Sequence, residues 1–149
     1  MGQKRILTIL IIGLLFFTSC KTYYISTDSF KEQFAGIDST KLKMVEMTGG
    51  GNLRVTEQYL ANPLTKIKCQ DKKGNPVELD NGPKIEIRFT YGENNKRTSG
   101  YFDRVFVSDS YVTFIQSRFI PTMRKTIPLK DITRIEVQNG GKNFKYISK

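Results

Sequence analysis

Few side chains in this chain of 149 residues are of the types that carry out chemistry. It contains two cysteines and no histidine, so it lacks Ser-His-Asp and Cys-His arrangements and the commonest protein ligand of transition metals. The two cysteines, Cys20 and Cys69, are far apart in the sequence. Cys20 has the more informative surroundings, because it directly follows an apolar stretch and two small residues.

The head of the chain has three parts. A short basic start is followed by an apolar stretch over residues 6–17 and by two small residues before Cys20. This layout is typical of a secretory signal. The apolar stretch is shorter than the roughly 20 residues that span a bilayer core. We therefore expect export, with cleavage by an ordinary signal peptidase and an uncleaved membrane anchor as the alternatives.

The residues Phe17-Thr18-Ser19-Cys20 resemble the lipobox of bacterial lipoproteins. The resemblance implies that a diacylglyceryl group joins the Cys20 sulfur, that residues 1–19 are removed, and that the new amino group is acylated, for example with palmitate. Two or three acyl chains hold a protein firmly to a membrane. Lys21 stands where an Asp can retain such proteins in the inner membrane, so the expected location is the outer membrane of the cell envelope, facing the periplasm.

This interpretation divides the chain into three parts. Residues 1–19 are the signal peptide, residues 20–27 a lipidated tether, and residues 28–149 one β-rich domain. Seven extended residues reach at most about 25 Å, so we expect the domain to lie close to the membrane. With Cys20 acylated, Cys69 has no partner for a disulfide, and we interpret it as a small buried apolar side chain.

Charge is the second strong feature of the composition. The chain has 24 Lys and Arg against 14 Asp and Glu, a formal charge of +10, and most of this excess lies beyond residue 19. Export argues against nucleic acid as the partner and favours lipid phosphates, an anionic envelope polymer or another envelope protein. The alternative is that the lysines only keep the protein soluble. The expected anion-binding residues are Arg118, Arg124 and Lys125, with Lys96 and Arg97 second.

The domain reads as mainly β. In residues 84–91, Ile85, Ile87, Phe89 and Tyr91 alternate with polar residues, as in a half-buried antiparallel strand. Further strands are expected at 42–48, 53–59, 64–70, 77–79, 111–115 and 134–138. We predict a single antiparallel curved sheet or small barrel with one short N-terminal helix.

That helix is expected over residues 29–35. Ser29 and Glu32 have the spacing of a capping box, Phe30 and Phe34 share one face, and Gly36 follows as a stop signal. We expect the aromatic stripe to pack on the sheet.

Two further expectations concern topology. Residues 100–108 are apolar on both faces, which predicts a central strand covered on both sides. The glycines of residues 139–141 predict a tight hairpin, with residues 144–147 pairing back on the preceding strand. The three glycines of residues 49–51 indicate a hairpin loop.

Residues 111–136 include the run Ile-Pro-Leu-Lys-Asp-Ile-Thr-Arg-Ile-Glu at 127–136. This stretch resembles part of bacterial pleckstrin-homology-like or GRAM-like sheets, in which two strands precede such an element. The resemblance covers about 30 residues and implies a curved β-sheet or small barrel. We do not extend it to phosphoinositide binding.

Together these features predict a lipid-anchored, non-enzymatic binding or scaffolding domain without a cofactor or metal. One alternative is a carrier of a small apolar ligand, which requires an internal cavity of a few hundred Å³. The other is an enzyme in which two carboxylates converge. The acids near strand ends are Asp71, Glu78, Asp80, Glu93 and Asp103.

Overall fold

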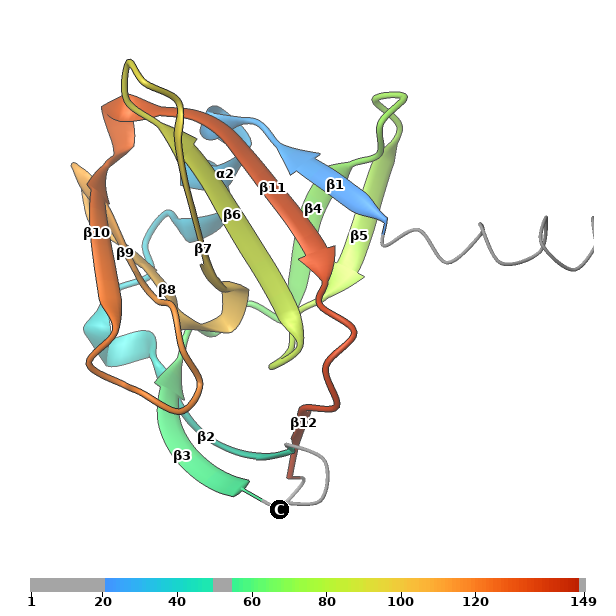
Figure 1. The fold of residues 1–149 in the computed structure, drawn as a ribbon, viewed down its shortest axis with the longest axis vertical. Coiled ribbons are helices and arrows are strands. Elements are labelled where there is room, and N and C mark those ends of the chain that lie inside the picture. Colours follow the sequence, from blue (N-terminus) through green and yellow to red (C-terminus); the bar gives the residue numbers. More distant parts are fainter. Residues whose placement is uncertain (1–20, 50–54, 148–149) are drawn as a thin grey trace, which may run out of the picture.

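The computed structural model of the chain describes residues 21–49 and 55–147. It is mainly β, with antiparallel sheets and one short α-helix, as the sequence predicts (Figure 1). The strands are β1 (Thr22–Ile25), β2 (Lys43–Gly49), β3 (Val55–Ala61), β4 (Lys66–Gln70), β5 (Pro76–Asp80), β6 (Ile85–Tyr91), β7 (Lys96–Tyr101), β8 (Val105–Val107), β9 (Tyr111–Ile115), β10 (Arg124–Pro128), β11 (Ile132–Asn139) and β12 (Lys145–Tyr146). The helices are α2 (Thr27–Phe34) and the 3₁₀ turns η2 (Ser39–Lys41), η3 (Phe102–Arg104) and η4 (Leu129–Asp131).

The strands are divided among three sheets. A six-stranded sheet has the order β5-β4-β1-β11-β6-β7, and two three-stranded sheets have the orders β10-β9-β8 and β12-β2-β3. Within the described residues no sheet closes on itself, so the curved-sheet alternative fits and the small barrel does not. The division into three sheets also corrects the expectation of a single one.

The centre of the six-stranded sheet confirms the alternation read from the sequence. In β6, Ile85, Ile87 and Phe89 are buried, whereas the residues between them are partly exposed. Its neighbour β11 places Val137 opposite Ile87 and Ile135 opposite Phe89 in antiparallel register. One face of the sheet is therefore apolar and turned inward.

This apolar face, α2 and the β10-β9-β8 sheet enclose what we call the main core. Phenylalanine rings connect its layers: the centroids of Phe89 and Phe114 are 5.0 Å apart, and those of Phe89 and Phe30 are 5.8 Å apart. Its buried members are Ile25, Phe30, Phe34, Ile67, Cys69, Ile85, Ile87, Phe89, Phe102, Val105, Val112, Phe114, Ile127, Leu129, Ile132, Ile135 and Val137.

Helix α2 covers this core, as expected, but it begins earlier than predicted. Ser26 is the N-cap, and its Oγ accepts a hydrogen bond of 3.2 Å from the backbone N–H of Ser29. Phe30 and Phe34 are buried against the sheet. Gly36 has a φ of +72°, a conformation that suits glycine and lets the chain leave the helix.

Most of the stretch predicted as a tether, residues 20–27, belongs to folded elements. Residues Thr22–Ile25 form β1, which lies inside the six-stranded sheet between β4 and β11. Ile25 is buried opposite Ile135, and Tyr23 lies opposite Val137. Tyr23 and Ile25 pack against the main core, and only Lys21 separates Cys20 from the sheet.

The single central strand predicted over residues 100–108 is also wrong. The chain turns at η3, so β7 ends at Tyr101 and β8 begins at Val105, and each strand is the outermost of its sheet. Gly100 lets β7 lie close to β9, because a Cβ there would lie only 2.7 Å from the carbonyl oxygen of Ile115. The apolar character of the segment reflects burial between two sheets.

The C-terminal hairpin takes a different partner from the one predicted. After the turn at Gly141, β12 pairs with β2, with Lys145 opposite Thr48 and Tyr146 opposite Met47, instead of returning along β11. Residues 50–54, which include most of the predicted glycine loop, lie outside the described residues. The pairing of β2 with β3 on either side of them is antiparallel.

Candidate functional site

A groove lies beside β8 on the described surface. It consists of two adjoining hollows of about 250 and 410 Å³, which share Ile37, Asp38 and Val107. The smaller hollow is mainly apolar and is lined by Ile37, Asp38, Ser39, Leu42, Val105, Phe106 and Val107. The larger one includes the charged residues Lys31, Asp38 and Asp109. We refer to both together as the groove.

One wall of the groove is the outer edge of β8. Within the described residues this strand pairs with β9 and has no strand on its other side. Val105 is fully buried, whereas Phe106 and Val107 are partly exposed toward the groove. At this edge the backbone groups of Val105 are already paired, because its N–H donates to the carbonyl oxygen of Phe102 and its carbonyl accepts from the Asn62 side chain. The part of the edge that can accept an extended peptide as an additional strand is therefore short and centred on Val107.

The opposite wall is the connection between α2 and β2. Asp38 caps η2, because its Oδ1 accepts a 2.8 Å hydrogen bond from the backbone N–H of Thr40. The Lys41 ammonium group donates to the carbonyl oxygen of Gly36. These contacts give a connection without long elements a defined path, and they hold Ile37 and Leu42 at the apolar hollow.

The β8 wall is held from behind by Asn62. Its Nδ2 donates to the carbonyl oxygen of Phe102 at 2.7 Å and to that of Val105 at 3.2 Å. Its backbone N–H donates to the carbonyl oxygen of Asp103 at 2.8 Å. In turn, the Asn81 Nδ2 donates to the Asn62 Oδ1 at 3.1 Å. One buried amide thus fixes η3 and the start of β8.

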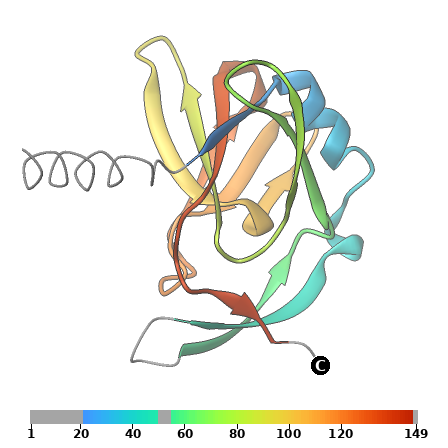
Figure 2. The ribbon, with the colours of Figure 1, turned by 90° about the vertical axis from the view of Figure 1, so that its right-hand side faces the viewer.

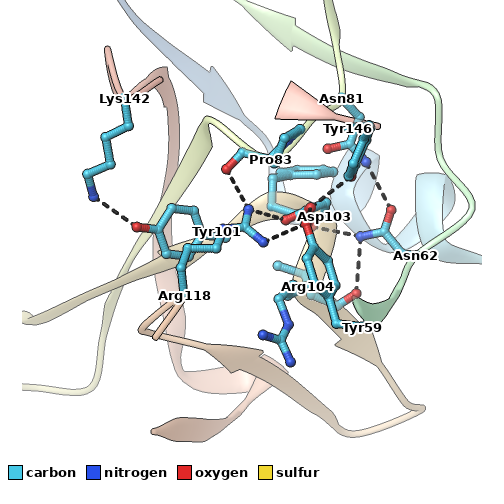
Figure 3. A network of polar contacts seen from close by, with 12 residues as sticks. Tyr59, Asn62, Asn81, Pro83, Tyr101, Asp103, Arg104, Arg118, Lys142 and Tyr146 are labelled. Atoms are coloured by element: carbon cyan, nitrogen blue, oxygen red, sulfur yellow. Dashed lines mark hydrogen bonds and ion pairs between the residues drawn. The ribbon is translucent and has the colours of Figure 1, made fainter. Parts of the chain in front are cut away.

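Next to Asn62 lies a group of charged and phenolic side chains, which we call the ionic cluster: Tyr59, Asp103, Arg118 and Tyr146 (Figure 3). The first three are buried, whereas Tyr146 closes the cluster at the surface and is 37% exposed. The side chains of Asp103 and Arg118 are 0% exposed and form an ion pair of 2.6 Å. Arg118 also donates to the carbonyl oxygen of Pro83 at 2.6 Å and to the Tyr59 hydroxyl at 2.8 Å. Hydrogen bonds in these numbers offset part of the cost of burying two charges.

The two tyrosines complete the coordination of the carboxylate. Their hydroxyls donate to the Asp103 Oδ2, at 2.6 Å from Tyr59 and 2.7 Å from Tyr146. Burial, followed by the nearby Asp103 charge, raises the pKa of Tyr59 and of Tyr146 well above the usual range. Both phenols therefore remain protonated donors at neutral pH. The Arg118 guanidinium also lies 3.9 Å from the centroid of the Tyr101 ring.

The structure separates the residues expected to bind an anion together. Arg118 is enclosed in the ionic cluster and already paired with Asp103, so it is not available to an external anion. Arg124 and Lys125 are exposed at the start of β10, and within the described residues no carboxylate pairs with either. Arg124 and Lys125 are thus free to contact an anion, but without Arg118, the residue expected to bind it with them.

Of Lys96 and Arg97, the second pair expected to bind an anion, one residue already has a carboxylate partner. Lys96 is exposed at the start of β7, whereas the Arg97 guanidinium lies 3.2 Å from the Glu136 carboxylate. Figure 2 shows the hairpin between β6 and β7, the connection between β9 and β10, and the start of β1 along the same side of the molecule, at its left. The α2–β2 connection that lines the groove lies at the right. The predicted basic residues and the groove therefore belong to different sides.

Cys20 lies outside the described residues, and Cys69 is buried in β4. The Cys69 Sγ lies 3.4 Å from the carbonyl oxygen of Val77, and burial raises the pKa of its thiol to about 11. A thiol with such a pKa is almost wholly protonated at neutral pH, which makes it a poor nucleophile.

Three of the five acids near strand ends are engaged in separate contacts. Asp71 accepts hydrogen bonds from the turn residues Lys73 and Asn75, and Asp80 pairs with Lys66 across β4 and β5. Asp103 is enclosed in the ionic cluster. Within the described residues no group of three His, Cys, Asp or Glu side chains is placed to hold a metal ion.

The sequence alone gave no indication of the groove, because its walls come from two separate segments. The ionic cluster had one visible signal, the adjacent charges Asp103 and Arg104 inside the apolar run of residues 100–108. Charges within such a run indicate buried polar contacts as readily as a surface turn.

Comparison with known protein families, curated proteins and solved structures finds no match to this chain. Among the helices of the described residues, none is both long and apolar enough to cross a bilayer.

Proposed function

We propose that the chain is a lipid-anchored protein of the bacterial cell envelope, held to the outer membrane through Cys20, and that its domain is a non-enzymatic binding module. The lipobox-like residues before Cys20 support the anchor. The observation that carries the proposal is the position of β1, which begins at Thr22 on the side of the molecule away from the groove (Figure 2). An acylated Cys20 leaves the groove facing away from the membrane.

The apolar hollow favours a particular kind of ligand. The hollow, of about 250 Å³, is open to the surface and adjoins the larger, more polar hollow, so it does not enclose an apolar small molecule as an internal cavity would. It does accommodate one or two apolar side chains of an extended peptide running beside β8. Main-chain pairing with a strand edge supplies affinity in this binding mode, and side-chain pockets supply specificity. We therefore propose an apolar, extended segment of another envelope protein as the ligand.

The charged residues of the larger hollow add to this selectivity. Lys31, Asp38 and Asp109 lie beyond the shared residues Ile37 and Val107. A segment with apolar residues at one end and polar residues at the other matches this order. The prepared walls, fixed by Asn62 and by the cap of η2, reduce the ordering cost of binding.

The anchor is tested by the mass of the protein recovered from membranes, beside that of a Cys20→Ala variant. We expect a chain that begins at Cys20 and carries added acyl mass, and we expect the variant to lack both features. An unmodified chain without acyl mass would overturn the anchor.

The groove is tested by selection from a library of displayed peptides, with the lipidated protein in detergent as the bait. We expect enrichment of peptides with alternating apolar residues. Leu42→Asp, which places a charge in the apolar hollow, should abolish the enrichment. Met44→Asp is the matched control, because Met44 is exposed on β2 outside the groove. No enrichment, or enrichment unaffected by Leu42→Asp, would overturn the proposed binding site.

A further inference from the structure

The connection between β9 and β10 carries an exposed apolar tip. Phe119, Ile120 and Met123 are 59%, 48% and 45% exposed. Large apolar side chains that are exposed singly are ordinary, but three within five residues form a patch that marks a contact with another apolar phase.

The tip is preformed by its own hydrogen bonds. The Ser117 Oγ accepts from the backbone N–H groups of Phe119 and Ile120, both at 3.2 Å. The Met123 N–H donates to the carbonyl oxygen of Ile120 at 3.0 Å, and its carbonyl accepts from the Gln116 N–H at 2.8 Å. These bonds satisfy backbone groups that would otherwise require water, so the tip can enter a less polar environment at low cost.

Basic residues follow the tip directly. Arg124 and Lys125 are exposed, and no carboxylate within the described part of the chain pairs with either. An apolar tip flanked by unpaired cations matches the chemistry of an anionic lipid surface, where acyl chains and phosphates lie one above the other.

The tip and the proposed anchor lie on the same side of the molecule (Figure 2). Thr22 pairs with Gln138, and the chain that continues from there reaches Phe144, whose ring centroid is 6.2 Å from that of Phe119. Only Lys21 separates Cys20 from β1, which limits the reach of the anchor to about 7 Å. An anchored domain cannot move this side far from the bilayer.

Resting on the lipid anchor proposed above, we infer that Phe119, Ile120 and Met123 enter the boundary between headgroups and acyl chains, while Arg124 and Lys125 contact the phosphates of anionic phospholipids. The anchor and the tip together then define two contact points. The domain is held in one orientation, with the groove directed away from the membrane.

The test uses the mature lipidated protein in vesicles of phosphatidylethanolamine and phosphatidylglycerol. A fluorophore is attached at Ile120→Cys in a Cys69→Ala background, and its quenching by a lipid-borne quencher is measured. Lys31→Cys on α2, at the opposite side of the molecule, is the matched control. We expect quenching at position 120 to exceed that at position 31 several-fold, whereas equal quenching would overturn the inference.

Charge reversal tests the cationic part. Arg124→Glu/Lys125→Glu should reduce quenching at position 120 at least several-fold, since each basic residue near an anionic surface contributes about a five-fold factor in affinity. The control Lys31→Glu/Lys43→Glu changes the net charge equally at exposed positions away from the tip and should have little effect. Equal loss in both variants would show nonspecific attraction and overturn the phosphate contacts.

The outcomes for the two proposals differ. Loss of acyl mass removes the anchor and, with it, the fixed orientation. A protein that carries acyl mass but shows no preferential quenching at position 120 overturns the tip contact alone.

Discussion

The main core and the Asp103–Arg118 pair of the ionic cluster are both buried, but the two regions are built by opposite means. The main core closes with apolar side chains such as Ile87 and Phe89, which touch many neighbours without directional bonds. The ionic cluster closes around one carboxylate, Asp103, that accepts from Arg118, Tyr59 and Tyr146. The first region joins the six-stranded sheet, α2 and the β10-β9-β8 sheet. The second joins the small β12-β2-β3 sheet to the rest of the molecule.

The difference follows from the size of the small sheet. Among the described residues, the buried members of its apolar cluster are Met47, Tyr59, Ala61, Tyr101 and Phe144. Apolar packing of this extent tolerates several alternative arrangements, whereas three short bonds to one carboxylate are satisfied in a single one. We expect the ionic cluster to specify where the small sheet docks, while the main core supplies most of the stability.

The largest effect is expected when one charge of the ionic cluster loses its partner. Arg118→Met leaves the Asp103 carboxylate buried without its cation, and breaking a buried pair in this way costs about 3–5 kcal/mol. We expect a loss of this size in the free energy of unfolding, measured by urea denaturation.

The double variant Asp103→Leu/Arg118→Met tests the reason for this loss. Replacing both partners by apolar side chains removes the unpaired charge, so the double variant should be more stable than Arg118→Met alone. If the double variant is instead less stable than Arg118→Met, the ion pair itself stabilises the fold. The proposed difference between the ionic cluster and the main core would then fail.

The main core was largely predictable from the sequence. The alternation over residues 84–91 gives the inward face of β6, and the spacing of Phe30 and Phe34 gives the buried face of α2. In both cases the partner is any apolar surface, so local periodicity is sufficient. The short strand β1 was missed because four residues after a predicted cleavage site carry too weak a pattern.

The ionic cluster and the groove were not predictable in the same way. The Asp103–Arg118 and Tyr59–Asp103 contacts join residues 15 and 44 positions apart, and nothing local to either residue names the other. The pairing of β12 with β2 likewise depends on tertiary contacts, since the glycines before it fit a hairpin equally well. The positive charge of Arg118 led to the prediction that it binds an external anion. In the structure Arg118 is buried, and its charge pairs with Asp103 inside the protein.

A smaller effect is expected at the amide that connects the ionic cluster to the groove. Asn62→Ala removes the donors to Phe102 and Val105 and leaves buried carbonyl groups unsatisfied, which costs about 1–3 kcal/mol. Because these bonds hold β8, the selected peptides should also bind more weakly. Asn94→Ala, in the exposed β6–β7 hairpin, is the control and should change neither quantity. Weaker stability with unchanged peptide affinity would separate Asn62 from the groove.

In the main core, removal of one methylene should cost less. Ile87→Val deletes a fully buried group in β6, with an expected loss of about 0.5–1.5 kcal/mol from the free energy of unfolding. The same urea denaturation measures it. A loss as large as that of Arg118→Met would mean that the main core is as intolerant as the ionic cluster, and the distinction between the two regions would be lost.

The ionic cluster and the main core should also differ in how their stability depends on pH. This difference is absent at neutral pH and appears only at alkaline pH. Burial raises the pKa of Tyr59 and Tyr146 in the folded protein, whereas the unfolded chain releases phenolic protons at about pH 10. The stability that depends on these protonated phenols is therefore complete below about pH 10 and is lost as the pH rises above it. Tyr146→Phe, which has one phenol fewer to ionise, should show a shallower decline of the urea midpoint between about pH 9 and 11.

Tyr111→Phe, at an exposed tyrosine of β9, is the control and should follow the parent protein. Identical slopes for Tyr146→Phe and the parent would show that the ionic cluster does not carry the alkaline sensitivity, and that its bonds are no more demanding than apolar contacts.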